Sequence, residues 1–444
     1  MIVMKFGGSS VGTADAIRHV GRVVSAAKDR EPVVVVSALS GITDTLLEAA
    51  NGAQQGIIEP HETVAIIRAR HEDLCAGLGL DHDTLLEPLD ELESFLHGVH
   101  LLRELTSRSQ DFILSHGEVL SSRIVAAHLS SIGVAAHPLT GWDAGIVTDA
   151  CHGEGGVLDD TYEQVKLRCQ YGDSVPVVTG FLGATTTGER TTLGRGGSDY
   201  TAAILGRALQ ADEIQIWTDV SGIYSADPRI VPSAFSLDEL SFEEAAELAF
   251  FGAKVLHPKT IEPAVKSGIP VRVLNTFEPA HPGTRIVGGS RTTRRAIVGL
   301  AAKKNNFVLT IESTRMLDAE GYLSRVFEVL HRYQVSVDAI ATSEVSVCMT
   351  IESRYREGVQ EAAKDLAEVA HVVLNEGHTL ICAVGQGLRE NPGTAAKIFT
   401  AMGDAGINIE MISMGSSKIN LTFVVADSDL QEAMCALHDT VIQS

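Results

Sequence analysis

Short runs of aliphatic and β-branched residues alternate with longer amphipathic segments over the first part of the chain. The runs cover residues 1–6, 32–38, 175–183, 213–220 and 269–275. Their length and composition predict buried strands. Strands that alternate with helices predict an α/β fold, with a mostly parallel sheet covered by helices on both faces and with binding sites at the carboxyl ends of the strands.

The segments between these runs have helical periodicity. After Thr13, the apolar residues Ile17, Val20 and Val24 recur at helical spacing, which predicts an amphipathic helix that begins near Thr13. Residues 44–130 are rich in Leu, Ala, Glu and His and have no strand pattern, so they predict several helices.

The last part of the chain repeats itself. Residues 321–340 and 393–412 align without a gap, and each copy has a glycine, an amphipathic helix and an alternating strand pair. This pattern predicts two small α+β modules that share a sheet. The polar, glycine-rich segment near 280–296 predicts a boundary. We therefore expect a first domain at 1–295 and a paired region at 296–444, with repeats at about 306–375 and about 378–444.

Composition and charge narrow the class of protein. The chain has 444 residues, 45% of them hydrophobic, and a net charge of −22, which argues against nucleic acid or an anionic membrane as partner. Its six cysteines form no CxxC pair, so we expect reduced thiols and no zinc site or disulfide framework. Without a leader pattern or a long apolar run, we expect a cytoplasmic protein.

The opening "KFGGSSVG" places a lysine and two glycines directly after the first strand. Bare backbone N–H groups at Gly7 and Gly8, beside the charge of Lys5, are suited to hold an anion. A tight turn between strand and helix is the alternative. The spacing matches neither the P-loop nor the dinucleotide-binding pattern.

Further polar clusters follow later strands and helices. In "TLGRGGSDYTA", Arg195 is suited to bind a carboxylate, Ser198 is the expected N-cap of a helix, and Asp199 falls in its first turn. An elaborate helix cap is the alternative. Glu118 lies in an otherwise apolar helix, where it either supports a cap or receives an amine. Lys254 follows a glycine and is either a site residue or a solvated lysine. Several cations with few acids suit phosphoryl transfer, because positioning and charge neutralisation supply most of its catalysis.

Six segments in order carry a resemblance to a known family. They are "KFGGSSVG" (5–12), "SALSGIT" (37–43), "SHGE" (115–118), "TLGRGGSDYTA" (192–202), "WTDVSGIYSADPR" (217–229) and "FGAKVLHP" (251–258). Together they resemble the aspartate kinases of the amino-acid kinase family, and the repeats resemble the paired ACT regulatory modules, βαββαβ-like in topology, of those enzymes. Ser9-Ser10 stands where many relatives have Thr-Ser, which keeps the hydroxyl.

The resemblance implies a phosphotransferase that uses ATP to convert L-aspartate to 4-phospho-L-aspartate, the committed step towards lysine, threonine, methionine and diaminopimelate. Lys5, Lys254 and Asp199 would be catalytic. Aspartate would be held by Thr43, Glu118, Arg195, Gly196, Gly197, Ser198 and Asp199. ATP would be held by Lys5, Gly7, Gly8, Ser9, Thr218, Asp219, Tyr224, Arg229, Lys254 and Val255. Mg²⁺ would arrive with ATP and be held mainly through its phosphates, so no protein metal ligand is expected.

The repeats imply feedback control by an amino acid. The first copy resembles the lysine-sensitive type, and its effector pocket would comprise Met316, Gly321, Leu323, Val337, Asp338, Ser343 and Glu344. Threonine-sensitive relatives tend to have a glutamine near Thr342, where this chain has none. ACT sites usually form between subunits, so a homodimer or larger homo-oligomer is expected, and modules that only dimerise are the alternative. No dehydrogenase-sized segment follows the repeats, so we expect a monofunctional kinase.

Two other functions would account for part of these features. A glutamate or acetylglutamate kinase has similar phosphate loops, but would not be expected to have the tandem repeats or "GRGGSDYTA". A catalytically silent amino-acid sensor would have lost Lys5, Arg195, Asp199 or Lys254, and all four are present.

Overall fold

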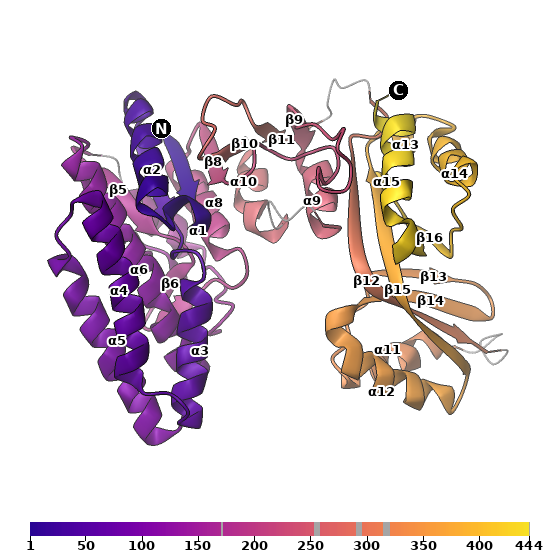
Figure 1. Ribbon diagram of the computed structural model, residues 1–444, viewed down its shortest axis with the longest axis horizontal. Helices are drawn as coiled ribbons and strands as arrows, with labels where there is room; N and C mark the ends of the chain where they lie inside the picture. Colours follow the sequence, from indigo (N-terminus) through magenta and orange to yellow (C-terminus); the bar gives the residue numbers. More distant parts are fainter. Residues whose placement is uncertain (170–171, 253–257, 290–294, 314–319, 444) are drawn as a thin grey trace. The chain divides into compact units, whose positions relative to one another are not determined.

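The computed structural model describes residues 1–169, 172–252, 258–289, 295–313 and 320–443. The chain forms two compact units (Figure 1). The first comprises Met1–Ile223, Asp238–Phe242 and Val255–Ser290, and the second comprises Tyr224–Leu237, Glu243–Lys254 and Arg291–Ser444. The segments Tyr224–Leu237 and Glu243–Lys254 thus belong to the second unit, although they precede the expected domain boundary. The boundary at residue 295 stays a prediction.

The first unit is built on an eight-stranded sheet with the order β3-β5-β2-β1-β8-β10-β11-β9. The strands from β3 to β10 run parallel, and β11 is antiparallel to β10. Their bounds are β1 Ile2–Phe6, β2 Pro32–Val36, β3 Ala136–Leu139, β5 Val175–Thr179, β8 Glu213–Thr218, β9 Glu239–Ser241, β10 Val271–Asn275 and β11 Thr284–Val287. A small sheet adds β4 Val147–Thr148, β6 Leu182–Thr185 and β7 Arg190–Thr192.

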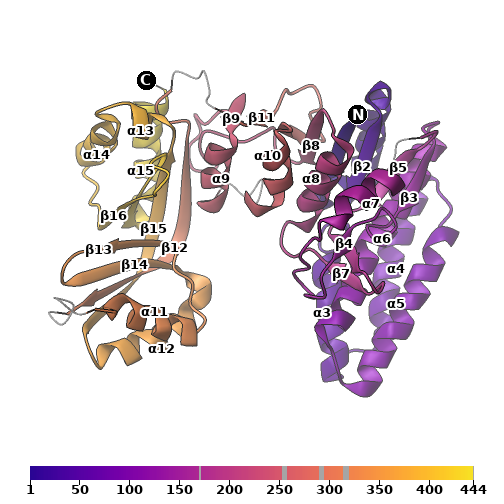
Figure 2. The same cartoon turned by 180° about the vertical axis from the view of Figure 1, so that it is seen from behind.

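Helices cover both faces of the large sheet. Four long helices, α3 to α6, pack side by side (Figure 1), while α7, α8 and α10 pack together (Figure 2). The bounds are α1 Gly8–Val11, α2 Ala14–Ala26, α3 Ile42–Gln55, α4 Pro60–Leu78, α5 Asp83–Leu102, α6 Ser107–Ser131, α7 Asp160–Arg168, α8 Gly197–Leu209 and α10 Glu262–Ser267, with short 3₁₀ turns at Lys28–Arg30 and Pro258–Ile261. As the periodicity predicted, Thr13 caps α2, because its Oγ1 accepts a hydrogen bond from Ala16 N at 3.2 Å.

Alternation along β1 sends its side chains to the two faces of the sheet. Ile2, Met4 and Phe6 are buried in one cluster with apolar residues of α2, α3, α5 and α6. The intervening residues, Val3 and Lys5, therefore face the other side, where α8 contacts the strand. A lysine can occupy this central strand because it lies near the carboxyl end, where its ammonium group reaches the edge of the sheet.

The second unit contains a six-stranded antiparallel sheet with the order β13-β14-β12-β15-β17-β16. Its strands are β12 Gly299–Glu312, β13 Ala339–Thr342, β14 Ser346–Glu352, β15 His371–Val384, β16 Met411–Met414 and β17 Asn420–Ala426. Its helices are α11 Tyr322–Arg332, α12 Arg356–Ala367, α13 Gly387–Glu390, α14 Thr394–Asp404 and α15 Leu430–Leu437, with a π-helical end at His438–Ile442. Helix α9, Phe242–Phe250, begins in the first unit and continues into the second.

The two repeats share the long central strands β12 and β15. Gly321 and Gly393 occupy equivalent N-cap positions of α11 and α14, with φ of 75° and 87°. The first half of β12 contributes Leu300 to the core of the second module, and the second half contributes Leu309 to the core of the first. The predicted pair of α+β modules on one sheet is therefore confirmed. The sequence comparison of the repeats did not reveal this exchange, because the strands concerned precede each aligned block.

Candidate active site

The carboxyl ends of the central strands meet at one edge of the large sheet. Directly after β1, Gly7 N donates to Trp217 O of β8 at 3.1 Å, and directly after β5, Gly180 N donates to Val36 O of β2 at 2.8 Å. The chain continues from β1 through α2 to β2, which pairs with one side of β1. On the other side of β1 lies β8, which in turn pairs with β10. Ligands of open α/β sheets bind at such a reversal of strand order.

An ion pair joins β1 to the first turn of α8 at this edge. Lys5 Nζ lies 2.6 Å from Asp199 Oδ1, and the two side chains are only 12% and 13% exposed. The carboxylate lies at a helix N-terminus, where the backbone N–H groups favour negative charge. The structure thus brings together two of the predicted catalytic residues and holds an ammonium group at the edge of the sheet.

The glycine pair after β1 lies beside Lys5 and the segment after β2, and at Gly8 a side chain would crowd the backbone of that segment. A Cβ on Gly8 would lie 3.0 Å from the Ala38 carbonyl oxygen, and a Cβ on Gly7 would lie 3.7 Å from Lys5 Nζ. The backbone around Gly7 and Gly8 is therefore bare beside a positive charge, while Ser9 is half-buried. An approaching anion would meet peptide groups and the Lys5 ammonium instead of side chains.

Glu118 is a buried carboxylate near the same edge. Its helix packs closely against the segment after β2, since a Cβ on Gly117 would lie 2.8 Å from the Ala38 Cβ. Glu118 is 3% exposed, and burial raises its pKa to about 8 against smaller opposing effects of backbone N–H groups and of Lys5. Within the described part of the chain, its Oε2 has no hydrogen-bond partner. This oxygen can accept a hydrogen bond from a ligand. A positively charged donor would also favour the ionised form of the Glu118 carboxyl group.

The loop that enters α8 carries the other predicted aspartate-binding residues. Arg195 is exposed, whereas Gly197 and Ser198 are buried at the start of the helix. The N-cap of α8 is Gly196, with φ of 73°, so the expectation of Ser198 as N-cap was wrong. Glycine adopts this left-handed backbone without strain, which lets the helix begin directly after Gly196. Thr43, near the start of α3, is half-buried.

The predicted nucleotide-binding residues fall in different parts of the chain. Thr218 ends β8, and its Oγ1 donates to the exposed Asp219 at 3.2 Å. Tyr224 and Arg229 belong to the second unit, where Arg229 donates to Asp227 at 2.7 Å. Lys254 and Val255 lie outside the described residues.

Those predicted effector residues that the structure describes lie in the first module of the second unit. Asp338 pairs with Lys303 Nζ at 2.9 Å, and burial raises the pKa of its carboxyl group. Ser343 forms a tight turn with Ser346, and Glu344 beside it is exposed. Of the remaining positions, Gly321 caps α11, Leu323 is 40% exposed, Val337 packs against the module core, and Met316 lies outside the described residues.

A cluster near the small sheet was not found from the sequence. Arg190 of β7 donates to Glu91 of α5 at 3.0 Å and lies over the ring of Phe112 at 4.3 Å. His116 of α6 contacts the same carboxylate at 3.1 Å, and these partners hold the pKa of Glu91 at about 2. The residues are far apart in sequence and follow no motif spacing, so no local signal could have identified them.

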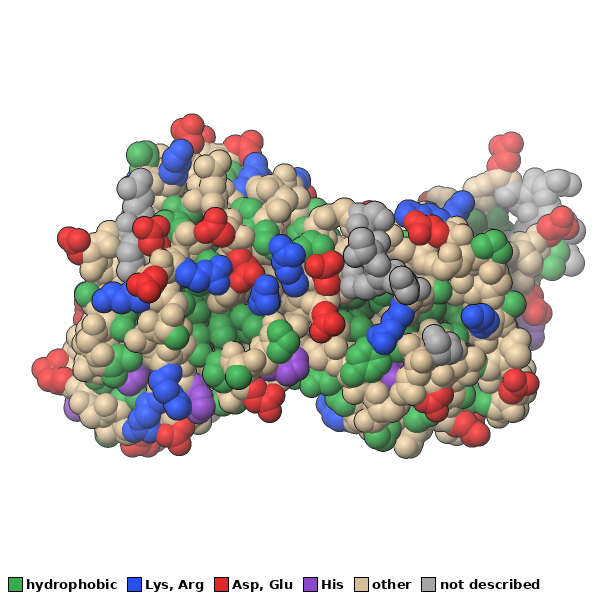
Figure 3. Space-filling model, turned by 90° about the horizontal axis from the view of Figure 1, so that it is seen from above, with side chains coloured by type: hydrophobic (Ala, Val, Ile, Leu, Met, Phe, Trp, Pro, Cys, Tyr) green, Lys and Arg blue, Asp and Glu red, His purple; other side chains and the backbone are tan. Residues whose placement is uncertain are grey.

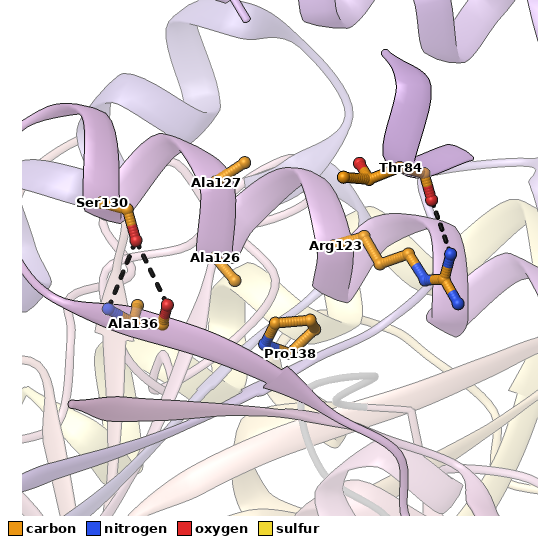
Figure 4. A pocket seen from close by; sticks show the side chains of 7 residues that line it. All are labelled: Thr84, Arg123, Ala126, Ala127, Ser130, Ala136 and Pro138. Carbon is orange, nitrogen blue, oxygen red and sulfur yellow. Dashed lines mark hydrogen bonds between the residues drawn. The ribbon is translucent and has the colours of Figure 1, made fainter. Parts of the chain in front are cut away.

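A groove on the outer side of α6 is a separate feature (Figure 4). It has a volume of about 420 Å³ and is lined by Thr84, Arg123, Ala126, Ala127, Ser130, Ala136 and Pro138. Its polar groups are engaged within the protein: Arg123 donates to Thr84 O at 2.6 Å, and Ser130 Oγ bonds the backbone of Ala136. The alanines and internally bonded polar groups of this groove are therefore poorly suited to bind a phosphate group or an amino acid.

The residues with described positions contain neither a candidate metal cluster nor a membrane-spanning helix. No group of His, Cys, Asp or Glu side chains there could hold a metal ion, and no helix there is long and apolar enough to cross a membrane. On the face drawn in Figure 3, acidic and basic side chains are interspersed.

Comparisons with known proteins identify the family. The model of the amino acid kinase family matches residues 1–275, and an ACT domain model matches residues 381–441. The chain is 38% identical over its full length to aspartokinase 1, chloroplastic, of Arabidopsis thaliana, covering 80% of that protein. It also resembles solved structures of Escherichia coli aspartokinase III. The complex with aspartate and ADP (R-state) matches with a TM-score of 0.81 and 32% identity, covering 100% of both chains. The complex with lysine and aspartate (T-state) matches with a TM-score of 0.85 and 34% identity, covering 99% of both chains. The chain belongs to the amino acid kinase family and, within it, to the aspartokinases.

Proposed function

We propose that this aspartokinase transfers the γ-phosphoryl group of ATP to the side-chain carboxylate of L-aspartate, giving 4-phospho-L-aspartate and ADP. The observation that carries this function is the buried Glu118 carboxylate at the same sheet edge as the Lys5–Asp199 pair, with one oxygen that has no partner among the described residues. One group is suited to an ammonium and the other to a phosphoryl group, as a reaction between an amino acid and ATP requires. The solved Escherichia coli relative holds aspartate and ADP.

Lys5 is proposed to neutralise the charge of the transferring phosphoryl group. An aspartate side-chain oxygen attacks the γ-phosphorus, the bond to the β–γ bridging oxygen breaks, and ADP leaves with that electron pair. The ammonium group is fixed in advance by Asp199 at 2.6 Å, so little reorganisation is needed when charge develops. The bare backbone at Gly7 and Gly8, with Ser9, would hold the phosphate oxygens, and Lys254 is proposed as the second catalytic cation.

Aspartate is proposed to be held at both of its ends. Glu118 would receive the α-ammonium group, which explains why a carboxylate is retained in a buried position. Arg195 is exposed and would pair bidentately with a substrate carboxylate. Thr43, Gly196, Gly197 and Ser198 would complete this part of the site, with Asp199 beside Lys5.

The adenine-nucleotide end of the site remains a proposal based on family motifs. Thr218, Asp219, Tyr224, Arg229, Lys254 and Val255 would contact the nucleotide. Mg²⁺ is proposed to be held mainly by phosphate oxygens and water, as is usual for this ion at phosphoryl-transfer sites.

Feedback control is proposed to act through the ACT modules, with lysine as effector. The Escherichia coli relative was solved with lysine in a T-state, which supports this choice. The pocket would comprise Met316, Gly321, Leu323, Val337, Asp338, Ser343 and Glu344. The effector must bind the inactive arrangement more tightly than the active one. A homodimer or larger assembly is also proposed, as is a cytoplasmic location, which six free cysteines support.

The test is a hydroxamate assay with the purified full chain. With ATP, Mg²⁺ and hydroxylamine, we expect aspartyl hydroxamate to form only when L-aspartate is present, and added lysine to lower the rate. L-Glutamate serves as the matched control, because it differs by one methylene group. Equal ADP release with both amino acids would refute the assignment of the substrate.

A further inference from the structure

We propose that Asp111 is a positioning residue for the aspartate site, which sets the spacing between Glu118 and the loop that carries Arg195. The inference rests on the proposed function and goes beyond it, since Asp111 lies in no family segment quoted above. It is a carboxylate on α6, 1% exposed, and contacts neither of the two groups proposed to bind the substrate.

Four donors converge on the Asp111 carboxylate from two segments. Thr192 Oγ1 donates to Oδ1 at 2.7 Å, and Thr192 N donates to Oδ2 at 3.2 Å. Gly153 N donates to Oδ2 at 3.0 Å, and His152 Nδ1 lies 3.0 Å from the same oxygen. Three of these contacts fall on Oδ2 and the Thr192 hydroxyl faces Oδ1, so this one carboxyl group ties both the 152–153 segment and Thr192 to α6.

The two segments also bind each other. Gly155 N donates to Thr192 O at 2.8 Å, and a Cβ on Gly194 would lie 3.4 Å from the Gly153 carbonyl oxygen. The start of the loop is therefore clamped between the carboxylate and the 152–155 segment. Thr192 itself is 1% exposed, so it is held as firmly as a core residue.

The α6 helix connects this clamp to the proposed ammonium site. Asp111 and Glu118 lie on one continuous helix, seven residues apart, which corresponds to about 10 Å along its axis. Arg195 follows Thr192 by three residues. A rigid helix with a carboxylate near each end of this span thus fixes the Thr192 backbone relative to Glu118. A bound aspartate would need this distance to be constant, because it would contact Glu118 and Arg195 simultaneously.

The test is Asp111→Ala, which removes both acceptor oxygens, with steady-state kinetics varied in each substrate. We expect kcat/KM for aspartate to fall roughly 10- to 100-fold, the scale of a misplacement of about 1 Å. The KM for ATP should stay within about twofold, because the glycine cradle follows β1 and is held to β8 by the Gly7 N–Trp217 O bond, not by the clamped loop. Asp90→Ala, at an exposed carboxylate of α5 paired with Arg68, is the matched control and should leave both parameters unchanged. Equal losses for both substrates, or no loss, would overturn the proposal.

A second pair of variants keeps the proposal testable if Asp111→Ala does not fold. Thr192→Val removes the hydroxyl donor and should weaken aspartate binding measured by calorimetry, whereas Thr192→Ser retains it and should restore binding. Equal affinities of the two variants would contradict the role. A wild-type chain that releases no ADP with aspartate would instead refute the proposed function, so the two failures are distinguishable.

Discussion

Replacing Glu118 by glutamine should stabilise the protein at neutral and alkaline pH. Burial raises the pKa of this carboxyl group from 4.5 to about 8, so the folded chain retains a proton that the unfolded chain releases. The unfolding free energy of the wild type must therefore fall as pH rises from about 4.5 to about 8. Glutamine resembles the protonated carboxyl group in shape but does not ionise, so the unfolding free energy of the variant lacks this decrease with pH.

The magnitude follows from the pKa difference. At 1.36 kcal/mol per unit, the wild type loses about 3 kcal/mol by pH 7 and about 5 kcal/mol above pH 8. Relative to wild type, Glu118→Gln should gain nothing near pH 4.5 and the full difference above pH 8. Denaturant unfolding at several pH values across this range measures the difference directly. Glu48→Gln, an exposed position of α3, should give a difference that does not change with pH.

The same variant should lose aspartate binding while it gains stability. A neutral amide cannot compensate the α-ammonium group, so the KM for aspartate should rise. In the wild type, binding must ionise Glu118, so calorimetry at pH 7 in buffers of different ionisation enthalpy should detect proton release upon aspartate binding. An unfolding difference that is flat with pH, or binding without proton release, would refute the reasoning.

Three further substitutions test other parts of the molecule. Lys5→Ala should lower kcat by roughly 10²- to 10³-fold with the fold retained by circular dichroism, and an unchanged rate would remove its role in charge neutralisation. Arg195→Lys should raise the KM for aspartate by about tenfold, because an ammonium group cannot form two parallel hydrogen bonds; unchanged kinetics would place the carboxylate elsewhere. Lys303→Met removes the ammonium group that bridges Asp338 and Glu352, and should destabilise the second unit by about 2–4 kcal/mol at pH 7 but less at pH 4, because burial raises the pKa of Asp338 and so favours its neutral form as pH falls. Equal losses at both pH values in denaturant unfolding would count against this last prediction.

Much of the fold was predictable because its signals are local. The Thr13 cap and the helical stretch depend on residues within a few positions of one another, and each was found where the pattern placed it. The strand runs are equally local, but the run at 175–183, predicted as one strand, is divided into β5 of the large sheet and β6 of the small sheet. The repeat offset likewise predicted the paired modules. The exchange of β12 between the two module cores was not predictable, because strand pairing depends on residues distant in the chain.

The candidate site was predictable in its residue types but not in its energetics. Motifs identified Lys5, Asp199 and Glu118, yet no motif states that the first two form an ion pair or that the third is buried with one oxygen unpartnered. The Ser198 cap was wrong because the choice of Gly196 depends on a backbone angle, which sequence pattern alone does not give.

The sequence by itself determined the secondary structure, the duplicated modules and the kinds of side chain at the ends of the strands, since local periodicity and short motifs encode these. Only the tertiary structure decided which of those side chains meet and how water is excluded around them. The pKa of Glu118 and the convergence of donors on Asp111 arise from segments that are distant in the chain but adjacent in space. Electrostatic energies depend on distance and solvent exposure, and both exist only after the chain has folded.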